Sequence, residues 1–160
     1  MTAHAVAMTL LLVIVAVVFV MGSCQHKPVM SHSRFIQLPL DGWQRTMPLT
    51  FVPEYDDSTG TYDIVLAVRH AGSYRYRNLS LVVDVIAADS TVNRQNIDMT
   101  LADEYGNWKG GGFGTLYQMT TPVQAGVSPE QARSVVVWQV MNGVDTLRSL
   151  ESLGLITRPN

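Results

Sequence analysis

Hydrophobic and polar side chains alternate with a period of two along most of the chain after residue 33, which is the pattern of β-strands with one buried and one solvent-facing side. The alternation is clearest at residues 62–69 and 79–85. Six further segments of similar length are predicted as strands: residues 34–38, 48–52, 96–101, 115–120, 134–141 and 154–158. The pattern therefore predicts about eight short strands.

Turn-forming residues stand between the predicted strands. Gly, Asp, Asn and Ser gather at residues 41–42, 57–60, 71–73, 105–107, 110–112 and 124–126. Strands at this spacing predict an all-β fold, an antiparallel β-sandwich of jelly-roll-like form, as a single domain over residues 34–160. Only residues 128–132 and 144–152 suggest helix, and both segments are too short to organise the domain.

An uncharged apolar run at residues 5–21 precedes the small pair Gly22-Ser23 and the only cysteine of the chain, Cys24. This arrangement is typical of a bacterial lipoprotein processing site. Ordinary signal cleavage prefers small residues at the first and third positions before the cut, and Met21 occupies the third. An uncleaved membrane anchor is the alternative, because the run is close to the length that spans a bilayer and no Lys or Arg precedes it.

The predicted processing divides the chain into a lipoprotein signal peptide, residues 1–23, and a lipidated tether, residues 24–33. A diacylglyceryl group is expected on the sulfur of Cys24, with a further acyl chain such as palmitate on the new amino terminus. Each buried methylene contributes about 0.8 kcal/mol of membrane affinity, so the lipid bilayer is a predicted partner. Apart from the covalent lipid on Cys24, no cofactor is expected. His26 and His32 of the tether are interpreted as solvated residues rather than metal ligands.

Composition argues against several classes of function. The formal net charge is −2 and there is no polybasic stretch, so no nucleic-acid partner is predicted. With Cys24 acylated, no thiol is left for a disulfide, a metal site or a nucleophile. His70 is expected at the surface beside a turn, without a serine partner. The carboxylates that could serve a glycosidase are expected on solvent-facing strand positions or in turns: Asp63, Asp84, Asp98 and Asp103. The chain is therefore predicted not to be an enzyme.

A polar and aromatic connection containing Asp103, Tyr105, Asn107 and Trp108 runs into a group of glycines at 110–114. In a functional interpretation the two rings contact a sugar or a partner protein, while Asp103 and Asn107 supply hydrogen bonds. In a structural interpretation Trp108 closes the end of the core, Asp103 caps the turn and the glycines allow tight backbone turns. We favour the structural interpretation and keep the four residues as candidate contacts.

Three further sequence patterns give weaker indications of function than the loop at residues 103–108. Tyr and Arg interleave at residues 74–77, which we interpret as strand packing with a solvated edge rather than a platform for nucleic-acid bases. Glu54, Asp56 and Asp57 could offer oxygens to calcium, but a solvated turn is the preferred interpretation. Short Asp-Ser/Thr triplets resemble an acceptor sequence for O-glycosylation of envelope proteins, and they lie at residues 57–59, 89–91 and 145–147.

Several local motifs occur in one order along the chain, and two of them are specific: Tyr-x-Tyr-x-Asn-Leu at residues 74–79, and Leu-Ala-Asp with Gly106, Trp108 and Gly110 at residues 101–110. They are preceded by Trp43 and followed by Trp-Gln-Val-Met at 138–141. This order resembles the GldH family of gliding-motility-associated lipoproteins of Bacteroidota. The resemblance covers nearly all of the chain after Cys24, although Asn142 stands where family members tend to carry Arg.

The resemblance implies a lipoprotein anchored in the outer membrane, with its domain facing the periplasm and linked to gliding and secretion machinery. It implies no enzymatic activity. No acidic cluster of the kind associated with export to the outer face follows Cys24, which favours the periplasmic side. The expected function is an accessory or structural component of an envelope assembly with a protein partner. A carbohydrate-binding β-sandwich module of the cell envelope is the alternative.

Overall fold

The computed structural model describes residues 30–160, and the strand pattern predicted from the sequence is confirmed there. All paired strands run antiparallel. They are β1 His32–Gln37, β2 Trp43–Gln44, β3 Leu49–Phe51, β4 Tyr62–Ala71, β5 Asn78–Ile86, β6 Val92–Thr100, β7 Gly111–Phe113, β8 Leu116–Val127, β9 Ser134–Gln139, β10 Thr146–Leu147 and β11 Leu150–Pro159. Within residues 30–160 no helix is long and apolar enough to cross a membrane.

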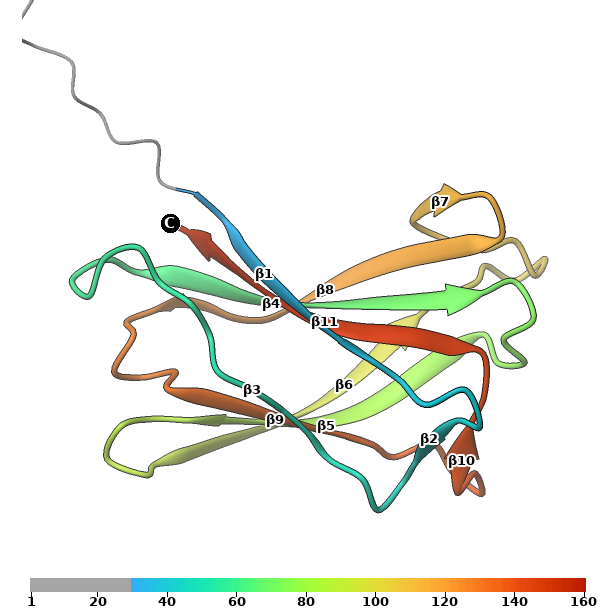
Figure 1. Cartoon of the computed structure of the whole chain (residues 1–160), viewed down its shortest axis with the longest axis horizontal. Helices are drawn as coiled ribbons and strands as arrows, with labels where there is room; N and C mark the ends of the chain where they lie inside the picture. Colours follow the sequence, from blue (N-terminus) through green and yellow to red (C-terminus); the bar gives the residue numbers. More distant parts are fainter. Residues whose placement is uncertain (1–29) are drawn as a thin grey trace, which may run out of the picture.

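The strands form two layers that face each other across one core (Figure 1). One sheet has the order β1-β11-β4-β8-β7, the other the order β3-β9-β5-β6, and β2 pairs with β10 in a small ribbon at one end. Without the ribbon strands β2 and β10 and the short edge strand β7, eight strands remain, and numbered in chain order they give sheets 1-8-3-6 and 2-7-4-5. That order is the jelly-roll arrangement of a β-sandwich.

The core is made by one face of each sheet. In β4, Ile64, Leu66 and Val68 are fully buried, and they belong to the same apolar cluster as Leu81 and Val83 of β5. Because side chains alternate across a strand, one apolar stripe from each sheet is enough to fill the space between them. The periodicity at 62–69 and 79–85 was therefore a correct prediction of the core-facing positions.

The outer side of β4 is covered by an aromatic ring. Phe35 of β1 lies across Gly154 of β11, where an added Cβ would come within 2.4 Å of the ring. Arg69 stacks on the other side, with its guanidinium carbon 3.7 Å from the ring centroid. This arrangement explains why Ala67, on the outer side of β4 opposite Gly154, is nonetheless buried.

The two predicted helical segments are wrong. The backbone N–H of Gln131 donates to the carbonyl of Ser128, which closes a single turn, and the N–H of Arg133 then returns to the carbonyl of Ile86 in β5. In the second segment Leu147 pairs with Trp43 in the β10–β2 ribbon. The first segment is therefore a turn between β8 and β9, and the second contributes to sheet pairing, so neither completes a helix.

The turn predicted at residues 124–126 is also wrong, because β8 continues through it to Val127. Gly126 has a positive φ of 64°, and its N–H donates to the carboxylate of Asp63 at 2.9 Å. The register between β4 and β8 shifts at Tyr62 and Ile64. The Gly that signals a turn in the sequence thus serves a bulge inside a long strand.

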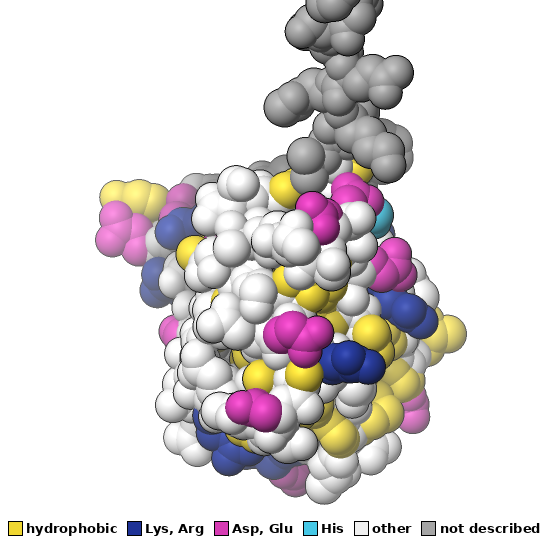
Figure 2. Space-filling view, turned by 90° about the vertical axis from the view of Figure 1, so that its left-hand side faces the viewer, with side chains coloured by type: hydrophobic (Ala, Val, Ile, Leu, Met, Phe, Trp, Pro, Cys, Tyr) yellow, Lys and Arg dark blue, Asp and Glu magenta, His cyan; other side chains and the backbone are white. Residues whose placement is uncertain are grey.

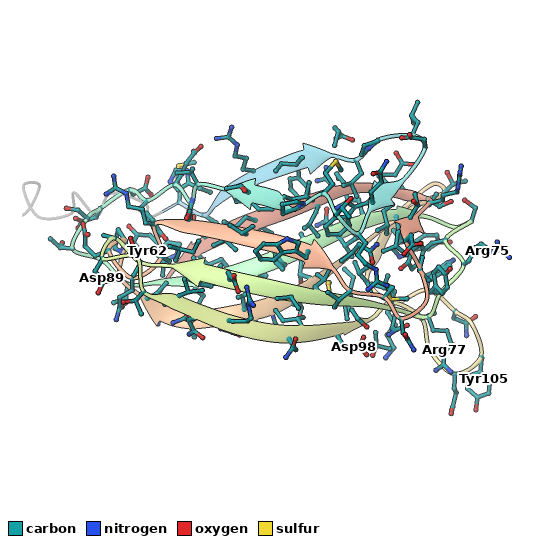
Figure 3. All side chains as sticks on the ribbon, turned by 90° about the horizontal axis from the view of Figure 1, so that it is seen from below. Tyr62, Arg75, Arg77, Asp89, Asp98 and Tyr105 are labelled. Atoms are coloured by element: carbon teal, nitrogen blue, oxygen red, sulfur yellow. The ribbon has the colours of Figure 1, made fainter. Side chains whose placement is uncertain are left out.

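The sandwich has two ends of different composition. Tyr62 and Asp89 lie at one end, whereas Arg75, Arg77 and Tyr105 lie at the other (Figure 3). The strand β1 begins at the Tyr62 end, and it begins at His32, two residues before the predicted start of the domain. The described chain therefore starts at one end of the sandwich, and the candidate loop lies at the opposite end.

Candidate functional site

The loop between β6 and β7 is organised by one carboxylate, that of Asp103. Its Oδ1 accepts the backbone N–H groups of Tyr105 and Asn107 at 2.9 and 2.8 Å, and its Oδ2 accepts the side-chain amide of Asn107 at 2.9 Å. These hydrogen bonds lower the pKa of Asp103 below its usual value, and the bond from the side-chain amide of Asn107 has the largest effect. An ionised Asp103 thus holds the loop in one shape and does not present its carboxylate freely to a ligand.

The two aromatic candidates, Trp108 and Tyr105, differ in their surroundings: one packs against the core and the other is exposed. Trp108 pairs with Ala102 across the loop and packs against the core, with its ring centroid 4.5 Å from that of His70 and 5.9 Å from that of Tyr117. These are the contacts expected of a tryptophan that closes the core. Tyr105 is instead 82% exposed at the loop tip. Of the four candidate residues, Tyr105 is therefore the one whose side chain is available to a partner.

His70 is not at the surface, which corrects the expectation from its place beside a turn. It is fully buried among the rings of Tyr74, Trp108 and Tyr117. Nδ1 lies 3.0 Å from the carbonyl oxygen of Ala71, so Nδ1 carries the proton, while Nε2 is buried without a hydrogen-bond partner. A positive charge on this ring would have no counter-charge among those contacts.

We expect His70 to make stability depend on pH. Burial lowers the pKa of His70, although the Ala71 carbonyl opposes this. The unfolded chain therefore binds a proton at a pH where the folded chain does not, and stability falls as the pH drops below the ordinary histidine value of about 6.5. Urea titrations of the natural chain at about pH 7.5 and about pH 5 should show this loss.

A His70→Phe variant removes the titrating group while keeping a ring in the cluster, and its loss of stability on acidification should be smaller. An unchanged pH dependence in His70→Phe would contradict the assignment.

Gly110 fixes the exit of the loop toward β7. Its φ is +88°, and an added Cβ would lie 2.1 Å from the carbonyl oxygen of Gln118 in β8. Gly106, with a φ of +86°, has no atom within 4 Å of an added Cβ. The two glycines thus differ in steric contact but share a conformation that only glycine adopts without cost.

Gly110→Ala should reduce the free energy of unfolding by about 2–4 kcal/mol, because backbone strain and a clash with main chain add. Gly106→Ala should cost about 1 kcal/mol, the strain alone. Chemical denaturation of both variants measures the difference. Equal losses would show that the loop shifts freely away from β8.

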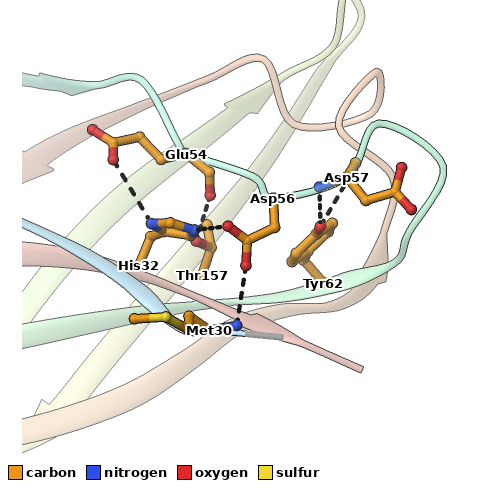
Figure 4. A network of polar contacts seen from close by, with 7 residues as sticks. All are labelled: Met30, His32, Glu54, Asp56, Asp57, Tyr62 and Thr157. Atoms are coloured by element: carbon orange, nitrogen blue, oxygen red, sulfur yellow. Dashed lines mark hydrogen bonds and ion pairs between the residues drawn. The ribbon is translucent and has the colours of Figure 1, made fainter. Parts of the chain in front are cut away.

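The acidic residues considered as calcium ligands contact groups of the protein itself (Figure 4). Asp56 accepts from Nε2 of His32 at 2.7 Å and from the N–H of Met30 at 3.0 Å, and Glu54 lies 3.9 Å from Nδ1 of His32. Asp57 accepts from the N–H and hydroxyl of Thr59. Within residues 30–160 no group of three or more His, Cys, Asp or Glu side chains could hold a metal ion. His32, assigned to the tether, thus lies in β1 and fixes it to the 53–57 loop.

One of the carboxylates expected on a wet strand face is buried. Asp84 of β5 has a side chain only 8% exposed, and both of its oxygens accept from Arg94 of β6 at 2.7 Å. Asp98 accepts instead from Ser80 and Asn78. Both carboxylates are therefore engaged in cross-strand pairs that link β5 to β6.

The remaining candidates stay predictions. Cys24 and the signal peptide lie outside the described residues. Ser58, Ser90 and Thr146 of the three short triplets are exposed, in connections or at the end of a two-residue strand, so a modifying enzyme could reach them. The Tyr and Arg residues at 74–77 form an extended connection rather than the start of a strand, with Tyr74 buried and both arginines exposed.

The sequence of the chain is similar to that of known lipoproteins. The model of a family described as GldH lipoprotein matches residues 31–156. A relative described as a gliding motility lipoprotein GldH homolog, from Christiangramia forsetii, is 26% identical over 141 residues, which cover 85% of this chain and 85% of the relative. The matched family region includes the loop at 103–110 and all strands but the end of β11.

Solved structures with partial similarity are viral. A Nora virus structure aligns with a TM-score of 0.36 at 12% identity, covering 81% of this chain and 54% of that chain. The Tobacco streak virus coat protein aligns with a TM-score of 0.33 at 9% identity, covering 85% of this chain and 92% of that one. Similarities at this level carry no argument about function.

Proposed function

Because the chain belongs to the GldH lipoprotein family, we propose that it acts as a membrane-anchored accessory component of an assembly in the cell envelope. The related protein is described as a gliding motility lipoprotein, so gliding or an associated secretion process is the proposed setting. That description names no reaction, and the carboxylates Asp84, Asp98 and Asp103 serve structural bonds. We propose no catalytic role.

Acylated Cys24 is the proposed anchor, in the outer membrane with the domain in the periplasm. Only five residues lie between Cys24 and Met30, where the described structure begins, and the six residue steps from Cys24 to Met30 reach at most about 20 Å. The end of the sandwich at which β1 begins would then lie close to the lipid surface. Acidic and basic side chains are both scattered over this end, without a basic patch (Figure 2), so we attribute attachment to acyl chains rather than to charge.

A protein partner is proposed at the opposite end, and the exposed Tyr105 is the observation that supports this placement. Tyr105 projects from a loop that Asp103 holds in one shape, and exposed tyrosines are enriched at protein contacts. A rigid loop loses little conformational freedom on binding. Arg75 and Arg77 lie at the same end (Figure 3), and they would add charge at the rim of such a contact.

A photoreactive amino acid at position 105 in living cells should cross-link to one envelope protein, because the loop tip contacts it. Val52 is also exposed but lies beside β3, so the same probe there is the matched control and should not capture that protein. Tyr105→Ala should weaken co-purification of the captured protein without lowering the melting temperature. Capture from position 52 alone, or undiminished co-purification of Tyr105→Ala, would contradict the placement.

Glycan binding is a second candidate function. The observation that favours it is a tryptophan on the outer face of the β3-β9-β5-β6 sheet, Trp138. This surface is separate from the Tyr105 loop.

A further inference from the structure

Trp138 lies on the solvent side of the β3-β9-β5-β6 sheet. Its neighbours in β9, Val137 and Gln139, are fully buried, so alternation directs the indole outward. Trp138 pairs with Val82 of β5, which in turn pairs with Asn96 of β6. Trp138 is therefore the outer member of a three-residue row across β9, β5 and β6, because β3 pairs with β9 only as far as Val137.

A fixed guanidinium flanks the indole. The Cζ atom of Arg94 lies 5.8 Å from the centroid of the Trp138 ring. Its Nε and Nη2 each donate to Asp84 at 2.7 Å, and the carboxylate is buried while the Arg94 side chain is 64% exposed. Asp84 thus acts as a positioning residue: it orients the guanidinium and leaves the remaining N–H groups of Arg94 facing solvent.

A second arginine borders the same surface. Arg45 donates through Nη2 to the carbonyls of Met141 and Val144, which holds its side chain beside β9. Its Nε is buried and has no hydrogen-bond partner, and the fully exposed carboxylate of Asp145 lies 3.9 Å from it. A shallow hollow of about 330 Å³ lies over the indole, and it is lined by Arg45, Val82, Arg94, Trp138, Gln139 and Val140.

We propose that this hollow binds an acidic sugar, a pyranose ring that carries a carboxylate, as in a uronic-acid polysaccharide. The apolar C–H face of the ring would lie on the indole of Trp138, and the carboxylate would pair with the exposed N–H groups of Arg94 that Asp84 leaves free. The size of the hollow suits a small ring, whereas a stable protein interface needs about 800 Å² on each partner. The exposed guanidinium of Arg94, which keeps N–H donors beyond its pair with Asp84, favours an acidic sugar over a neutral one.

This site goes beyond the proposed assembly role and does not depend on it. The site lies on a sheet face, and the proposed partner contact lies at a loop tip, so variants of one leave the other intact. A negative result here therefore leaves the Tyr105 proposal standing, and the reverse also holds.

Calorimetric titration of the full chain, purified in detergent, with a tetramer of galacturonic acid tests the proposal. We expect saturable binding that weakens as salt is added, and at least about tenfold weaker binding of cellotetraose, a neutral tetramer. Equal affinity for both tetramers, or no binding of either, would overturn the proposal.

A Trp138→Leu variant should weaken binding of the acidic tetramer by about tenfold or more, since a ring contact is lost. Tyr105→Ala is the matched control, because it removes an exposed ring from another surface, and it should bind as the natural chain does. Unchanged affinity in a folded Trp138→Leu variant would overturn the proposal.

Nuclear magnetic resonance on the natural chain keeps the test independent of the variants. The indole N–H signal of Trp138 should shift on addition of the acidic tetramer, whereas that of Trp43, which is buried and bonded to the Met47 carbonyl, should not. A bound tetramer that leaves the Trp138 signal unmoved would place the sugar elsewhere and overturn the proposal.

Discussion

A Trp43→Ala variant is expected to lose about 3–5 kcal/mol of its free energy of unfolding. Trp43 is fully buried, and its indole N–H donates to the carbonyl of Met47 at 2.7 Å. Its backbone pairs with Leu147, so β2 and β10 together close one end of the sandwich around the indole. Truncation leaves a large cavity and an unpaired carbonyl, and a typical domain has only about 5–15 kcal/mol of stability in total.

Urea unfolding followed by circular dichroism measures this loss. Trp43→Phe is the matched control, because it keeps an aromatic ring but removes the N–H donor, and it should lose about 1–3 kcal/mol. If Trp43→Ala lost less than about 1 kcal/mol, the end of the core would have to collapse around the missing ring without cost.

The periodicity of the sequence located the core strands because their core-facing positions carry large apolar side chains at every second residue. In β4 every second residue from Tyr62 onward is buried, and the same spacing continues to His70. The signal for a buried His70 was therefore present, but the polarity of histidine and the adjacent turn argued against it. Periodicity at a strand end was the better guide, since the ring cluster of Tyr74, Trp108 and Tyr117 covers the position.

Other features could not be predicted because their cause lies outside the local sequence. The edge strand β6 begins at Val92, four residues before its predicted start, and most of its residues are polar or exposed, so alternation is absent there. In β9 both faces carry apolar side chains, which hides the outward direction of Trp138. The burial of Asp84 requires its partner Arg94 on the neighbouring strand.

The proposed location of the protein depends on Cys24, whose predicted role is covalent attachment of lipid rather than a contact in the fold. No helix of the described residues is long and apolar enough to cross a membrane, and family membership supports a lipoprotein. A single acyl chain binds a membrane only marginally, but two or three chains at about 0.8 kcal/mol per methylene hold a protein almost permanently. Replacing Cys24 removes all of the acyl chains together, so membrane association should be lost completely rather than gradually.

Cys24→Ser is expected to abolish labelling of the protein with radioactive palmitate and to stop removal of residues 1–23, because both steps require the cysteine thiol. With an ordinary cleavable secretory signal in place of residues 1–23, the serine variant should leave the membrane fraction for the soluble periplasmic fraction, with at least about a hundredfold loss of membrane partitioning. Ser23→Ala keeps a small residue before the cysteine and should behave as the natural chain. Palmitate labelling that persists in Cys24→Ser would refute acylation at this position. Natural protein whose amino terminus is intact and unlabelled would instead favour an uncleaved anchor at residues 5–21.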